Sequence, residues 1–137
     1  MRRFFIIAVL VAVAFGTLAY WYRIGSRVHV PAGPAVSIDV FLIPHEPVAT
    51  ITNAAGLAAV MSTLRSGRPA KPHECAARGT MEVRFADGRT LAVAFAPGHE
   101  LPHYEFGMGG HSFTISRSQF FESLKAGGVD VQKLPTE

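Results

Sequence analysis

The chain has 137 residues and a formal net charge of +3, and 49% of its residues are hydrophobic. Its length suits a single domain, and its recurring aromatic and β-branched residues exclude a disordered protein. The single cysteine, Cys75, excludes a disulfide scaffold. The excess positive charge lies near the N-terminus, in Arg2, Arg3, Arg23 and Arg27. No basic stripe with interleaved aromatic residues follows, so we expect no nucleic-acid partner.

A 19-residue apolar segment, Phe4–Tyr22, follows the first two arginines. Within it, only Gly16 and Thr17 lie outside the hydrophobic set. As a helix, this segment would rise roughly 28 Å, close to the hydrocarbon thickness of a bilayer. The aromatic cluster Tyr20–Tyr22 at its end is typical of a membrane interface. We therefore predict an N-terminal signal-anchor transmembrane helix over residues 1–24, with the membrane as its partner.

A cleaved signal peptide is the alternative interpretation of this segment. Ala12–Ala14 and Ala14–Gly16 both fit the small-residue pattern at signal-peptide cleavage sites. The apolar run continues past either site, which favours an uncleaved anchor. The slight excess of positive charge before the segment favours a cytoplasmic N-terminus. We therefore predict a single-pass membrane protein whose C-terminal domain is extracytoplasmic, with a cleaved, secreted form as the alternative.

Glycine and proline are frequent after the apolar segment, which predicts a juxtamembrane linker over residues 25–35. The predicted extracytoplasmic domain spans residues 36–137. Apolar and polar residues alternate at its start, which predicts a strand over 36–43. The turn-forming residues Pro44–Pro47 end that strand.

A helix is predicted over residues 54–65, with Asn53 as its capping residue. Its apolar side chains share one helical face: Leu57, Val60, Met61 and Leu64. Gly67 and Pro69 end the helix, and residues 68–74 are predicted to form a loop.

Two alternating segments on either side of Asp87–Gly88 predict a β-hairpin. A two-residue loop would place the apolar sets of the two strands on opposite faces. A three-residue loop, Ala86–Gly88, pairs Val83 with Leu91 and keeps both sets on one face. This loop requires Gly88 to adopt a left-handed conformation.

A second hairpin is predicted around Gly109–Gly110, a two-residue turn that pairs Phe106 with Phe113. Together the two hairpins form an antiparallel four-stranded meander over residues 76–115. The meander has one apolar face, and its other face carries polar or small residues and is able to face water.

The last predicted element is a helix over residues 117–126. Ser116 and Gln119 fit a capping box at its start, and Gly127–Gly128 end it. The predicted fold class is therefore α+β: an N-terminal transmembrane helix followed by a small two-layer domain, in which two helices cover one face of the four-stranded meander. In layout alone, this order resembles small exported domains of the β-lactamase-inhibitor-protein type and many bacterial lipoprotein modules. No motif accompanies the resemblance, so it implies no functional residue.

Three histidines and the cysteine should gather at one end of the meander: His73, Cys75, His99 and His103. One thiol and three imidazoles are suitable ligands for zinc or copper. The spacing matches no established metal signature, and the flanking prolines favour ordinary polar loop residues. A Cys75–His pair is also the one candidate for nucleophilic catalysis, but no third residue that would orient it is identifiable. We therefore predict no cofactor and no catalytic residue.

The function predicted from the sequence is a membrane-anchored, extracytoplasmic, non-catalytic binding or accessory domain. It would be inhibitor-like, with a protein or an envelope component as its partner. The alternative is a periplasmic zinc- or copper-binding protein that uses the four His and Cys residues named above.

Overall fold

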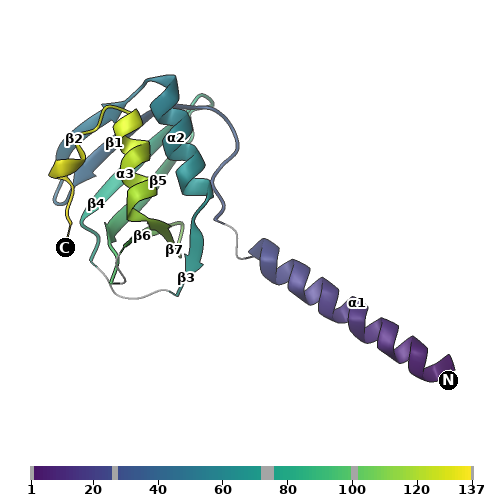
Figure 1. The fold of residues 1–137 in the computed structure, drawn as a ribbon. Helices are drawn as coiled ribbons and strands as arrows, with labels where there is room; N and C mark the ends of the chain where they lie inside the picture. The colour runs from purple at the N-terminus through teal and green to yellow at the C-terminus, as the bar shows by residue number, and fades with distance from the viewer. Residues whose placement is uncertain (1, 26–27, 72–75, 100–101, 137) are drawn as a thin grey trace.

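The computed structural model describes residues 2–25, 28–71, 76–99 and 102–136. A long helix, α1, precedes a globular domain of strands and helices (Figure 1). The elements in chain order are α1 (Arg2–Gly25), β1 (Ala35–Leu42), β2 (Glu46–Ile51), α2 (Ala54–Arg65), β3 (Arg68–Ala70), β4 (Gly79–Phe85), β5 (Thr90–Pro97), β6 (His103–Met108), β7 (His111–Ser116), α3 (Arg117–Ala126) and the 3₁₀ helix η1 (Val131–Lys133).

In the described part of the chain, all the strands form one seven-stranded antiparallel sheet in the order β2-β1-β4-β5-β6-β7-β3. The predicted four-stranded meander is therefore wrong, because β1 and β2 extend the sheet beyond β4, and β3 extends it beyond β7. Because proline is frequent in turns, Pro47 and Pro69 made the segments that form β2 and β3 resemble turns in the sequence. Both lie in edge strands, where a missing backbone N–H need not interrupt a ladder. Consequently, the predicted loop over residues 68–74 begins with a strand.

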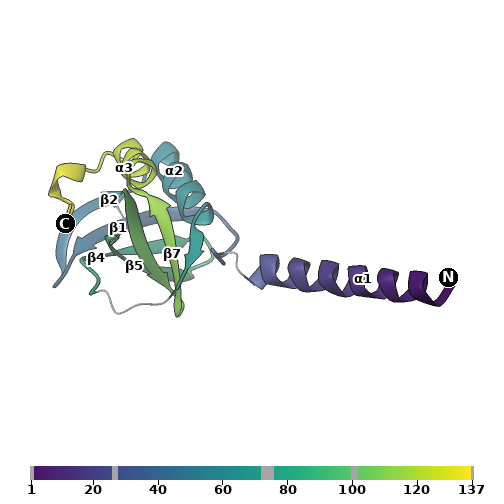
Figure 2. The same cartoon turned by 60° about the horizontal axis from the view of Figure 1, so that its bottom comes forward.

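The α+β character of the domain is confirmed, and α2 and α3 lie on one face of the sheet (Figures 1 and 2). Alternate strand residues on this face pack under the helices and form the hydrophobic core. Ile38, Met81, Phe106 and Phe113 contribute from the sheet, and Phe120 contributes from α3. The opposite face of the sheet has no helix of the described chain over it and is called the open face below (Figure 2).

The registers predicted for both hairpins are confirmed. Val83 lies opposite Leu91, and Gly88 has a φ of +84°. Phe106 lies opposite Phe113 across the second hairpin. Gly109 and Gly110 have φ values of +55° and +81°, as a tight two-residue turn requires.

Both helices of the domain have the predicted bounds, and each begins at a side-chain cap. Asn53 accepts a hydrogen bond from the Gly56 N–H at 2.7 Å, and Ser116 accepts one from the Gln119 N–H at 3.2 Å. The Gln119 side chain does not complete a capping box. It donates instead to the hydroxyl of Ser66 at 2.8 Å, which links the start of α3 to the end of α2.

Helix α1 extends away from the globular domain (Figure 1). Within the described part of the chain, no helix is sufficiently long and apolar to cross a membrane, which contradicts the transmembrane helix predicted for residues 1–24. The described apolar side chains of α1 are exposed, with Phe15 at 72% and Leu18 at 73%.

Candidate functional site

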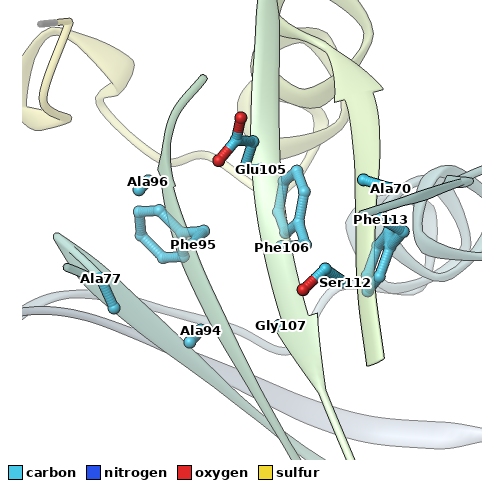
Figure 3. A pocket seen from close by; sticks show the side chains of 10 residues that line it. All are labelled: Ala70, Ala77, Ala94, Phe95, Ala96, Glu105, Phe106, Gly107, Ser112 and Phe113. Carbon is cyan, nitrogen blue, oxygen red and sulfur yellow. The ribbon is translucent and has the colours of Figure 1, made fainter. Parts of the chain in front are cut away.

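The open face of the sheet is hollowed where small side chains meet across neighbouring strands. Along β5, Ala92, Ala94 and Ala96 project onto this face, and Ala94 lies opposite Gly107 of β6. Because these residues carry a methyl group or no side chain, a space remains above them between the larger side chains nearby. The result is a cavity of about 230 Å³ (Figure 3).

We call this cavity the sheet-face hollow. It is lined by Ala70, Ala77, Ala94, Phe95, Ala96, Glu105, Phe106, Gly107, Ser112 and Phe113 (Figure 3). Of the described residues, only Glu105 and Ser112 bring polar side chains to it. The hollow therefore combines a small apolar floor with polar groups on one side, a composition typical of recognition pockets.

A second cavity, of about 700 Å³, adjoins the hollow towards the edge strand β3. We call it the basic rim, and it is lined by Arg68, Ala70, Lys71, His99, His103, Glu105 and Thr114. Ala70 and Glu105 line both cavities, so the two form one recess on the open face.

Among the described residues that line it, the basic rim carries two formal positive charges, on Arg68 and Lys71, and one formal negative charge, on Glu105. Lys71, His99 and Glu105 each interact with other residues of the chain. Within the described residues no ion pair engages Arg68, which is exposed on β3. This guanidinium is therefore available to bind an anion.

Two of the four predicted metal ligands, His99 and His103, line the basic rim. The Gly98 N–H donates to the His103 carbonyl at 2.8 Å, which closes the loop between β5 and β6 and holds these segments together. His73 and Cys75 lie outside the described residues. Among the residues that are described, no three His, Cys, Asp or Glu side chains are grouped to hold a metal ion.

Sequence reasoning missed the hollow and the cations beside it. It predicted a polar or small open face, but it assigned Arg68, which lies in β3, to a loop. The alternating alanines at positions 92, 94 and 96 were the available signal, because three small residues on one side of a strand leave that face open.

Among the described residues, the two groups with shifted pKa values, Asp87 and Tyr104, lie outside both cavities. The Arg89 backbone N–H, as the largest cause, lowers the pKa of Asp87 in the first hairpin turn. Burial raises the pKa of Tyr104 in the core, and the charge of Arg117 partly opposes this effect. Neither residue therefore supplies an activated group to the hollow.

An ion pair stabilises the other half of the open face. Asp39 on β1 is 7% exposed and accepts hydrogen bonds from Arg84 on β4 and Thr50 on β2, both at 2.6 Å. These contacts connect three adjacent strands.

Comparison of the chain with protein-family models, curated protein sequences and solved structures finds no match. The recess on the open face is therefore the feature from which a function is inferred.

Proposed function

We propose that the globular domain is a non-catalytic binding domain that holds a protein partner on the open face of its sheet. The observation that carries this proposal is the sheet-face hollow, a recess of about 230 Å³ with an apolar floor. A hydrophobic side chain of the partner fills such a recess and excludes water from it, as interface anchors do.

The edges of the sheet favour recognition through the face rather than through strand addition. Pro47 lies in edge strand β2, and the pairing of β2 with β1 is interrupted by a register shift between Val40 and Phe41. The other edge, β3, has only three residues and contains Pro69. Short, proline-containing or bulged edges disfavour pairing with a strand of another chain.

The side chains of the hollow suit binding rather than catalysis. Its polar groups are Glu105 and Ser112, and the described histidines that lie nearest line the rim instead. Nucleophilic catalysis needs a hydroxyl or thiol within hydrogen-bond reach of a base. No hydrogen bond joins Ser112 to an imidazole among the described residues.

We propose further that the domain works outside the cytoplasm and that the apolar N-terminal segment directs its export. The hydrophobic core includes no described residue of α1, so this helix is available for a separate role. Alkaline phosphatase fused to the C-terminus should be active, because its disulfides form only in an oxidising compartment. N-terminal sequencing that starts at Phe15 or Thr17 would establish a cleaved, secreted form, and an inactive fusion would contradict export.

Filling the hollow tests the binding function. In Ala94→Leu the added side chain occupies the hollow, whereas Ala92→Leu places the same group on the same strand and face outside it. After chemical cross-linking in cells, we expect adducts of the full chain to fall about tenfold for Ala94→Leu and to persist for Ala92→Leu. Matched melting temperatures would show that both variants fold. Adducts that survive Ala94→Leu, or no adduct with the wild-type chain, would overturn the proposal.

Metal binding is the second candidate function, and the shared position of His99 and His103 in the basic rim favours it. It predicts that zinc or copper raises the melting temperature of the chain at one equivalent, and that His103→Ala abolishes the increase. If neither zinc nor copper changes the melting temperature, this candidate is excluded.

A further inference from the structure

We propose that the partner presents an extended acidic segment, and this inference rests on the binding function proposed above. A carboxylate of the segment lies in the basic rim beside Arg68. An apolar side chain, two residues away in the segment, lies in the sheet-face hollow.

The spacing between the two cavities is the first support for this arrangement. Arg68 pairs with Thr114, and Ala70 pairs with Ser112. The two pairs are therefore neighbours along the strands on the open face. Arg68 and Thr114 line the rim, and Ser112 lines the hollow. Residues i and i+2 of a strand are about 6.6–6.8 Å apart. An extended peptide places alternate side chains at the same spacing and on the same side, which matches one side chain to each cavity.

The charge of the rim is the second support. Among the described residues that line it, Arg68 and Lys71 exceed Glu105 by one formal positive charge. A guanidinium presents parallel N–H donors that match the two oxygens of a carboxylate. Because Arg68 has no ion-pair partner in the described chain, binding there replaces water rather than an existing salt bridge.

The rest of the open face supports an acidic partner near β3. Glu82 and Asp39 project from β4 and β1, on the far side of the hollow from β3, and the charge of Asp39 is matched by Arg84. Among the described residues, Glu82 on the β1 side has no ion-pair partner, whereas Arg68 and Lys71 line the rim on the β3 side. An acidic segment is therefore attracted to the β3 side of the open face, where Arg68 lines the rim.

Selection of random peptides on the immobilised full chain tests the inference. A mild detergent is included because the exposed apolar side chains of α1 would otherwise promote aggregation. We expect enriched peptides to carry Asp or Glu two positions from a large apolar residue. A synthetic copy of the best peptide should bind about tenfold more weakly when its acidic residue is replaced by the corresponding amide.

Protein variants separate this inference from the general binding function. Arg68→Glu should weaken binding of the peptide about tenfold or more, and Arg68→Gln provides a milder change at the same exposed position. Lys133→Glu, a charge reversal on exposed η1, should change binding less than about twofold. Ala94→Leu should abolish binding, whereas Ala92→Leu should not.

Each result has a definite meaning. Peptides that lack acidic residues, or acidic peptides that bind the Arg68 variants normally, would overturn the acidic-segment inference, while sensitivity to Ala94→Leu would still support the binding function. Peptides that bind Ala94→Leu normally, or no enrichment at all, would overturn both.

Discussion

Gly56 in α2 packs directly against Gly127 at the end of α3. A Cβ built on Gly56 would lie 2.4 Å from the Cα of Gly127 and 2.8 Å from Cγ2 of Ile51. A Cβ on Gly127 would likewise lie 2.7 Å from Cδ1 of Ile51. Because neither glycine has a side chain, α2, the end of α3 and β2 can pack closely over the core.

Gly56→Ala should therefore lower the free energy of unfolding by about 1–3 kcal/mol. Helix propensity alone would favour alanine by about 1 kcal/mol, but the atom that obstructs the new methyl group belongs to the backbone and has little freedom to move. Gly16→Ala, where nothing lies within 4 Å of the added Cβ, is the matched control and should cause no loss. Urea unfolding of both variants checks this, and unchanged stability of Gly56→Ala would contradict the close packing.

A substitution at Gly88 tests the backbone conformation alone, because the added side chain makes no steric contact. Its φ is +84°, and nothing lies within 4 Å of an added Cβ. Gly88→Val should destabilise the domain by about 1–3 kcal/mol, because a β-branched residue is strained at positive φ. Gly88→Asn should cost clearly less, since asparagine tolerates the left-handed region. Thermal melting of the two variants measures the difference, and equal melting temperatures would argue against the left-handed turn.

The Arg84–Asp39 ion pair should contribute more than a surface pair because Asp39 is buried. Arg84→Met leaves a carboxylate that is 7% exposed with Thr50 as its remaining side-chain partner, and we expect a loss of about 1–2 kcal/mol. That value allows for the half-exposed Arg84 side chain, which water screens. Lys125→Met removes an exposed pair with Glu122 and should cost less than about 0.5 kcal/mol. Equal losses in denaturant unfolding would show that burial of Asp39 adds nothing.

Local signals predicted the central hairpins and both helices of the domain correctly. The glycines at 88, 109 and 110 occupy turns that few other residues tolerate, so each turn determined the register of its hairpin. Asn53 and Ser116 are caps whose hydrogen-bond partners lie three residues away in sequence. In each case, the residues that specify the structure are neighbours in the chain.

The outer strands and the recess depend on pairings between distant residues. Residues 68–70 become strand β3 only because they pair with residues 112–114 of β7, and nothing within residues 68–70 indicates that partner. The hollow likewise requires Ala94 to lie opposite Gly107, and the rim requires Arg68 to lie opposite Thr114. A single sequence shows the small and basic residues, but it does not show which distant strand will face them.

Tyr104 links the core to the C-terminal segment and should make stability depend on alkaline pH. Its side chain is fully buried beside Phe120, and its hydroxyl donates to the carbonyl of Pro135. The guanidinium of Arg117 lies 5.9 Å from the centre of its ring. Burial raises the pKa of this phenol above the ordinary value of 10.0, and the charge of Arg117 offsets part of the increase.

The direction of the pH effect follows from the neutral phenol in the folded protein. Near pH 10 the unfolded chain loses the Tyr104 proton while the folded protein retains it, so ionisation stabilises the unfolded state. The contribution of Tyr104 is complete below about pH 10 and declines as the pH rises through the higher folded pKa. Tyr104→Phe should lose about 1 kcal/mol at neutral pH with its hydrogen bond, but its stability should fall less between about pH 9 and pH 11. Tyr20→Phe, on exposed α1, should retain the wild-type pH profile. Urea unfolding across this range measures both slopes, and parallel profiles for the wild-type and Tyr104→Phe chains would show that the Tyr104 phenol ionises equally in the folded and unfolded states.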